Sequence, residues 1–306
     1  MLSRGAAGIV ATMPSPLVRI VREAYRRELV PARARWHLAA GATLDWYRAA
    51  ARGLRDDVGD ASRGLVAEMI ARTLERRYDA LRAEHAWLAD RTADPRAPAR
   101  LFGALYRLAL RPRAAWVLGG LGGPPRGPGE LLRAERELLR LPVEQRWREV
   151  TVHLGESLIV MTERLPGRVA HPRKRLGDIC FAMGARYGAQ IRRLFELPDA
   201  GDRAAQALEV LRISEYLFRV NPEHWGGTDV SAGTGWLEGT ACPWYARPGW
   251  NGGHCGIFGQ FQAGVCSVFG LRYHLSSTIP KHGGSTCRVD LRPIALRRGK
   301  DGPAVG

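Results

Sequence analysis

Apolar residues recur at intervals of three and four positions along roughly the first two thirds of the chain, which is the period of an α-helix with one buried face. The longest such stripe lies within residues 61–89 and consists of Leu65, Met69, Ile70, Leu74, Tyr78, Leu81 and Leu88. Several prolines lie between the periodic segments and are expected to end helices. The sequence therefore predicts further helices over residues 17–30, 36–54, 98–111, 129–141, 143–164, 174–196 and 201–219.

The pattern changes after Val220, where glycine, threonine, serine, cysteine and aromatic residues become frequent. Beyond this point, alternation and composition predict strands over 233–241, 271–278 and 287–294 and a tightly packed helix over 255–270. Lys281-His282-Gly283-Gly284 is typical of a hairpin turn between the last two strands. We therefore expect an α+β protein, in which a large all-helical N-terminal portion precedes a small C-terminal α+β domain with an antiparallel sheet.

A segment rich in glycine and proline, GGLGGPPRGPG over residues 119–129, interrupts the helical portion. A phosphate-binding loop would need a preceding strand, a lysine and a serine or threonine in register, and these are missing. We interpret the segment as a linker. It would join an N-terminal helical region over residues 1–118 to a region over 130–306 that carries helices, the α+β layer and the cysteine-rich site.

The chain of 306 residues has a formal net charge of +16 and is long enough for one large domain or two modest ones. Because arginines alternate with acidic residues along the predicted helices, we interpret most of this charge as solvated helix faces. An anionic small-molecule substrate and a homo-oligomer are both compatible with the sequence. A nucleic-acid partner is the least favoured, because the aromatic residues do not interleave with basic ones.

The five cysteines are an odd number, and the N-terminus does not resemble a secretion signal. Its apolar stretch covers only about seven residues and precedes Pro14 and Pro16. No segment approaches the roughly 18 apolar residues that a membrane span requires. We therefore expect a cytoplasmic protein without membrane association, in which thiols are free, catalytic or metal-bound.

Cys242, Cys255, Cys266 and Cys287 all lie in the last quarter of the chain. Cys255 is the strongest candidate for a functional thiol, because its glycine neighbours allow close approach of a substrate. If a helix begins here, its N-terminus would lower the pKa of this thiol and favour the thiolate. We interpret Cys266 as a core residue, and a core position is an equal alternative for Cys242.

A histidine close to Cys255 would act as base or proton donor, and His254 and His282 are the main candidates. A zinc site is less favoured, because structural sites usually present their ligands in closely spaced pairs and these cysteines are far apart. A catalytic metal held by His254, Cys255 and His282 stays open. We predict no obligatory cofactor.

Several of these residues follow one another in an order that is known from a protein family. They are Glu238, Cys242-Pro243-Trp244, Cys255 before an apolar helix, Thr278-Ile279, Gly283-Gly284 and Cys287-Arg288-Val289. In this order, residues 176–293 resemble the C-terminal part of the L-2-amino-thiazoline-4-carboxylic acid hydrolase family. The resemblance implies an α+β domain that hydrolyses a C–N or C–S linkage in a small cyclic amidine-like carboxylic acid.

Two positions depart from the family pattern. Phe258 stands where an acidic residue is expected, and Val289 stands where a phenylalanine is expected. The missing acid removes a group that would act as a base or orient water, which puts the family's own reaction in question. The helical portion before residue 170 is not explained by the resemblance.

The sequence thus predicts a hydrolase-like enzyme that acts on a cyclic amidine, thiazoline-type or amino-acid-derived carboxylic acid, in a ring-opening or ring-closing step of a biosynthesis. The predicted catalytic residues are Cys255, His254, Cys242 and His282. The predicted substrate-binding residues are Trp244 as an apolar wall, Cys287 as a lining thiol, and Arg247 or Arg272 as the partner of a carboxylate. The alternative is a non-catalytic sensor domain that binds a small molecule or a metal.

Overall fold

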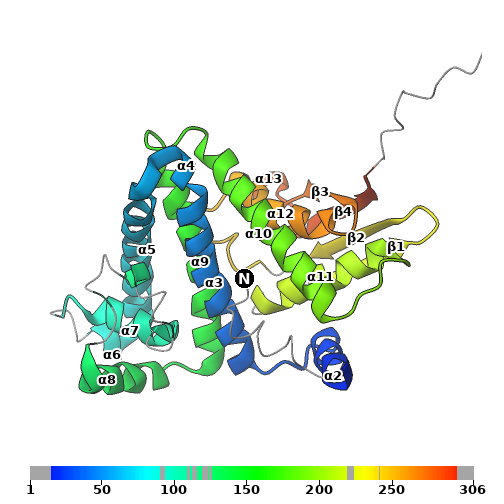
Figure 1. Cartoon of the computed structure of the whole chain (residues 1–306). Helices are drawn as coiled ribbons and strands as arrows, with labels where there is room; N and C mark the ends of the chain where they lie inside the picture. Colours follow the sequence, from blue (N-terminus) through cyan, green and yellow to red (C-terminus); the bar gives the residue numbers. More distant parts are fainter. Residues whose placement is uncertain are drawn as a thin grey trace, which may run out of the picture.

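Long helices occupy one side of the molecule and a small sheet occupies the other (Figure 1). The structure is a computed structural model, and it describes residues 15–89, 94–108, 111, 116–118, 123, 126–218, 224–240 and 242–294. The arrangement is of the α+β class with an antiparallel sheet in the C-terminal part, which confirms the fold class predicted from the sequence.

The helical body follows the apolar periodicity closely. Its helices are α2 (Ser15–Arg26), α3 (Ala32–Gly53), α4 (Arg55–Val58), the 3-10 turn η1 (Gly59–Ala61), α5 (Ser62–Glu84), α6 (Ala86–Ala89), α7 (Ala97–Leu105), α8 (Gly127–Leu139), α9 (Val143–Arg164), α10 (Pro172–Leu194) and α11 (Arg203–Phe218). Pro31 and Pro142 stand immediately before α3 and α9, where a proline fits a helix start. The single helix predicted over 61–89 is divided, because His85 adopts an extended conformation between α5 and α6.

The sheet contains β1 (His224–Asp229), β2 (Thr234–Gly239), β3 (Leu271–Ser277) and β4 (Cys287–Pro293) in the order β1-β2-β4-β3, and each neighbouring pair is antiparallel. The first of these strands was not predicted. The tight turn predicted at Lys281–Gly284 does not form. The connection between β3 and β4 instead contains the short helix α13 (Ile279–His282). Gly283 ends this helix with a positive φ of 68°, a conformation that suits glycine.

Helix α12 (Gly252–Ser267), which carries Cys255, lies between α10 and the sheet (Figure 1). Its approach to α10 depends on two glycines. A Cβ atom added at Gly184 would lie 1.8 Å from the carbonyl oxygen of Phe261, and one added at Gly264 would lie 2.1 Å from that of Phe181. These glycines let the two helix backbones come close together and thereby fix the position of α12.

Two clusters of buried apolar residues form the core. One joins α3, α5, α7, α8, α9 and α10 to Trp244, Trp250 and Ile257, and the other lies beneath the sheet around Leu237, Val289 and Leu291. Residues 119–122, 124 and 125 of the predicted linker lie outside the described residues, and α8 already begins at Gly127. The proposed domain boundaries stay a prediction.

Charged side chains are also buried within the helical body. Arg77 donates two hydrogen bonds to Glu149, of 2.8 and 2.7 Å, and Arg100 donates two of 3.2 Å to Glu137. Part of the arginine content is therefore used inside the protein and not on solvated helix faces. Among the helices in the described ranges, none combines the length and the apolar character needed to cross a membrane.

Candidate functional site

Cys242, Cys255 and Cys287 line one cavity of about 90 Å³, which we call the cysteine cavity. The three thiols come from separate elements: the loop after β2, the first turns of α12 and the start of β4. The predicted wall residue Trp244 lines the same cavity. Other residues that line it include Glu215, Phe218, His224, Trp250, Phe258, Phe261, Gln262, Tyr273 and Thr278. Cys266 is buried in the core beneath the sheet and does not line the cavity.

The position of Cys255 is set by the cap of α12. The side chain of Asn251 accepts a hydrogen bond of 2.9 Å from the backbone of Gly253, while the backbone N–H of Asn251 donates to His254 Nδ1 at 3.1 Å. This reciprocal pair is a capping box, with histidine in the place that glutamate or glutamine usually takes. Trp250 Nε1 then donates to the Sγ atom of Cys255 at 3.3 Å.

Burial raises the pKa of the Cys255 thiol to about 11, and the neighbouring thiols of Cys242 and Cys287 act in the same direction. The hydrogen bond from Trp250 lowers the pKa but does not balance the loss of solvent. The expectation that a helix N-terminus would lower this pKa is therefore wrong, because burial outweighs that effect. At neutral pH the resting form of Cys255 is the neutral thiol.

His254 does not line the cysteine cavity. Its Nε2 atom lies 2.8 Å from the Oγ1 atom of Thr162 on α9, its Nδ1 atom accepts the backbone hydrogen bond of the cap, and its ring stacks on Trp250. Burial is the main cause that lowers the pKa of His254. Both ring nitrogens therefore serve to hold α12 in place against α9.

His282 is exposed and does not line the cavity either. Its Nδ1 atom accepts a hydrogen bond of 2.9 Å from the backbone N–H of Thr278, which holds the turn before α13. The next backbone N–H, that of Ile279, donates to the Sγ atom of Cys287 at 3.4 Å. This turn brings Thr278 to the cavity, where its buried hydroxyl oxygen has no hydrogen-bond partner among the described residues.

Neither of the two arginines predicted to bind a substrate carboxylate lines the cysteine cavity. Arg272 is exposed on β3, opposite Arg292 of β4. Arg247 lies with its Nη2 atom 3.8 Å from a carboxylate oxygen of Glu156, and burial lowers its pKa. Among the described residues that line the cavity, there is no arginine or lysine, whereas the carboxylates of Glu215 and Glu238 are present.

Sequence reasoning missed two groups of polar residues in the cavity. The first is His224, which lies opposite Gly239 in the β1–β2 ladder, while Gly239 lies opposite Cys287 in the β2–β4 ladder. Residues directly opposite each other on adjacent strands share a face of the sheet. His224 and Cys287 therefore flank a position without a side chain, and this leaves room between the imidazole and the thiol.

The second group is a chain of hydrogen bonds between α11, α12 and β3. The hydroxyl of Tyr273 donates to Gln262 Oε1, and Gln262 Nε2 donates to the carboxylate of Glu215. Glu215 and Gln262 are buried, with 8% of each residue's surface exposed. This chain fixes the orientation of the Glu215 carboxylate at the cavity, which Glu238 of β2 also lines.

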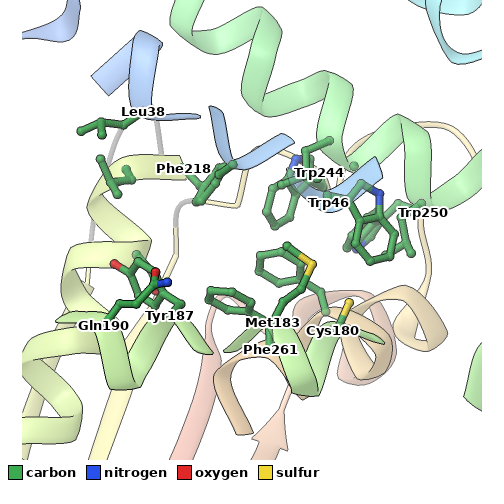
Figure 2. Close-up of a pocket in the computed structure, with 17 residues that line it drawn as sticks. Leu38, Trp46, Cys180, Met183, Tyr187, Gln190, Phe218, Trp244, Trp250 and Phe261 are labelled. Atoms are coloured by element: carbon green, nitrogen blue, oxygen red, sulfur yellow. The ribbon is translucent and has the colours of Figure 1, made fainter. Parts of the chain in front are cut away.

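A second cavity, of about 100 Å³, adjoins the first, and we call it the aromatic chamber. Figure 2 shows it between α3, α9, α10, α11 and α12, with Tyr187 and Gln190 together at one end. The two cavities share the side chains of Ser214, Phe218, Trp244, Trp250, Phe258 and Phe261. Phe258 thus belongs to the aromatic wall at the position where the family resemblance expects an acid.

Trp244 is fixed in this wall by its surroundings. Its Nε1 atom donates to the carbonyl oxygen of Thr151 at 2.8 Å, and its ring lies 4.6 Å from that of Phe258 between centroids. A Cβ atom added at Gly155 of α9 would lie 2.3 Å from the indole. The glycine therefore makes room for the indole against α9.

Across the ranges that the structure describes, no group of three or more His, Cys, Asp or Glu side chains is arranged to hold a metal ion. None of the five cysteines is in a disulfide bond, and the three that line the cysteine cavity do not form such a group among the described residues.

No protein-family model, curated protein or solved structure matches this chain. The family resemblance of residues 176–293 therefore stays a prediction.

Proposed function

We propose that the protein is an enzyme that acts on a small cyclic amidine- or thiazoline-type molecule in the cysteine cavity and breaks or forms a C–N or C–S bond of its ring. The observation that carries this proposal is the convergence of three thiols, the imidazole of His224 and the carboxylates of Glu215 and Glu238 on a single cavity. Enclosed cavities with a few convergent polar groups are the usual sites of small-molecule chemistry.

In the proposed reaction, Cys255 acts from its neutral form. The thiol adds across the C=N bond of the ring, so that Sγ bonds to the carbon while the thiol proton passes to the ring nitrogen, directly or through His224. The bond between that carbon and the leaving ring atom then breaks as a C=N bond forms again, and the proton released from the amidine nitrogen passes to the leaving atom. Water attacks the remaining thioimidate and displaces the thiol, which regenerates Cys255.

The carboxylate of Glu215 favours a substrate that presents N–H donors, as an amidine does, because charge-assisted hydrogen bonds to carboxylates are strong. A substrate with its own carboxylate is less favoured, since the described lining residues supply no guanidinium or ammonium group. We therefore propose an uncharged or cationic ring in place of the anionic substrate expected from the sequence. We also propose a cytoplasmic setting, in which the thiols stay reduced.

The test measures ring opening of 2-amino-2-thiazoline and of its 4-carboxylate by liquid chromatography and mass spectrometry. We expect turnover of the compound that lacks the carboxylate. For Cys255→Ser we expect a loss of at least about a thousandfold in kcat/KM, since removal of a catalytic nucleophile can cost up to about a millionfold. Cys266→Ala is the matched control, because Cys266 lies on the same helix but outside the cavity. Full activity of the Cys255→Ser variant would contradict the proposal.

The second candidate function is a non-catalytic domain that binds a small molecule. It is favoured by the raised pKa of Cys255 and by the engagement of both nitrogens of His254 in structural hydrogen bonds. This candidate predicts that the wild-type protein binds 2-amino-2-thiazoline without converting it. Substitution of Cys255 would then change the affinity alone.

A further inference from the structure

Two buried polar atoms at the far end of the aromatic chamber have no hydrogen-bond partner within the described structure. They are the hydroxyl oxygen of Tyr187 and the Oε1 atom of Gln190. The two residues are three positions apart on α10, so their side chains lie on the same face of the helix, and both line the chamber (Figure 2). An unpaired buried polar atom is unfavourable, because it has lost water without gaining a partner.

The rest of the chamber is predominantly apolar and leads toward the thiols. Between ring centroids, Tyr187 lies 5.5 Å from Phe261, and Phe261 lies 6.3 Å from Phe258. Both phenylalanines also line the cysteine cavity. Aromatic side chains that face a cavity favour a planar or compact apolar guest. The two cavities therefore meet at these rings, with the thiols on one side and Tyr187 and Gln190 on the other.

We propose that the aromatic chamber binds an apolar ring of the ligand, and that Tyr187 and Gln190 hydrogen-bond a hydroxyl or amide at the far end of that ring. This inference rests on the proposed function in one respect, since it describes a further part of the same substrate. The binding of that part does not depend on turnover. It defines the substrate class as an amidine-type ring joined to a small aromatic or compact apolar group with a polar end.

The test compares fluorobenzene with 4-fluorophenol by ¹⁹F NMR titration of the full chain. A purely apolar chamber would prefer fluorobenzene, because burial of an unpaired hydroxyl is unfavourable. If Tyr187 and Gln190 receive the hydroxyl, 4-fluorophenol binds more tightly, by about tenfold for a gain of about 1.4 kcal/mol. In the double variant Tyr187→Phe/Gln190→Leu, this preference is expected to reverse.

Two further variants control this experiment. Tyr216→Phe removes a hydroxyl that donates to the carbonyl oxygens of Glu28 and Val30, and Tyr216 does not line the chamber, so the preference for 4-fluorophenol is expected to persist. Ala42→Phe adds a ring to the chamber wall and is expected to abolish binding of both compounds. Failure of both compounds to bind the wild-type chain would overturn the inference, as would a preference for 4-fluorophenol that survives in the double variant.

The outcome is separable from that of the proposed function. If the phenol preference behaves as expected while Cys255→Ser keeps full turnover, the chamber is a ligand site and the catalytic assignment is wrong. If Cys255→Ser is inactive and the preference is absent, the reaction stands and the chamber does not bind the substrate.

Discussion

The buried polar groups of the helical body and those around the two cavities differ in what surrounds them. In the helical body, Arg77 and Glu149 form a double hydrogen bond, and the Tyr47 hydroxyl lies 2.7 Å from His153 Nε2. Around the cavities, the hydroxyls of Thr278 and Tyr187 have lost solvent without gaining a partner in the part of the chain that the structure describes. The helical body also keeps buried atoms without a described partner, such as Nη1 of Arg77 and Nδ1 of His153. Thr278 and Tyr187 differ because they line a cavity, where a bound molecule can reach the unpaired hydroxyl.

The largest effect is expected from breaking the pair between α5 and α9. Arg77→Met would leave the carboxylate of Glu149 without its partner, and burial already acts to raise the pKa of Glu149. Removal of one member of a buried ion pair usually costs about 3–5 kcal/mol, because the remaining charge is uncompensated. We expect the free energy of unfolding, measured by urea denaturation, to fall by about this amount.

The double variant Arg77→Met/Glu149→Leu is the control for this prediction. With both charges replaced by apolar side chains of similar size, most of the lost stability is expected to return. A single variant as stable as the wild type would show that the pair does not hold the helical body together, and the contrast between the two regions would fail.

A smaller effect is expected in the pH dependence of stability, through His153. This histidine is fully buried beside Tyr47, Phe102 and Tyr106, and burial lowers its pKa to about 3. The unfolded chain has a histidine pKa of about 6.5, so between these two values the unfolded state binds more protons than the folded state. Stability from this group is present above pH 6.5 and is lost as the pH falls, by up to about 1.4 kcal/mol per pH unit.

The measurement compares urea denaturation of the wild type and of His153→Gln at several pH values between 7 and 4. Glutamine cannot titrate, so the variant is expected to lose stability less steeply on acidification, whatever its stability at pH 7. Parallel pH profiles would indicate that His153 becomes protonated in the folded protein. The helical body would then hold a buried, positively charged imidazole.

The helices could be predicted from the sequence because their signals are local. Helix α9 occupies the predicted range 143–164, since Pro142 precedes it and the apolar period continues through it. Strand β1 could not be predicted, because Gly226 and Gly227 weaken its strand signal. Since the strand was missed, the placement of His224 in the same row as Gly239 and Cys287 was missed as well.

Only part of the candidate site could be predicted from the sequence, because the tertiary fold brings its residues together. The three thiols were grouped by their order in the chain, and the structure brings them to one cavity. Adjacency in sequence was misleading for His254, because its ring turns back to cap α12 while Cys255 faces the cavity. The pKa of Cys255 could not be inferred from a helix start, because it depends mainly on how deeply the tertiary fold buries the thiol.

The smallest effect on stability, and the sharpest on function, is expected from Thr278→Val. Its hydroxyl is buried without a partner, so the isosteric valine should leave the free energy of unfolding unchanged or raise it by up to about 1 kcal/mol. Thr151 supplies a matched control, because its hydroxyl is equally buried and unpartnered but does not line either cavity.

If the Thr278 hydroxyl binds the ligand, Thr278→Val lowers the affinity for 2-amino-2-thiazoline about tenfold, the equivalent of one hydrogen bond. Thr151→Val should leave that affinity unchanged while it alters stability to a similar extent. Isothermal titration calorimetry and urea denaturation of both variants separate the two effects. Equal affinities for the two variants would mean that the Thr278 hydroxyl forms no hydrogen bond with the ligand. An unpaired polar group beside a cavity would then indicate function no better than one inside the helical body.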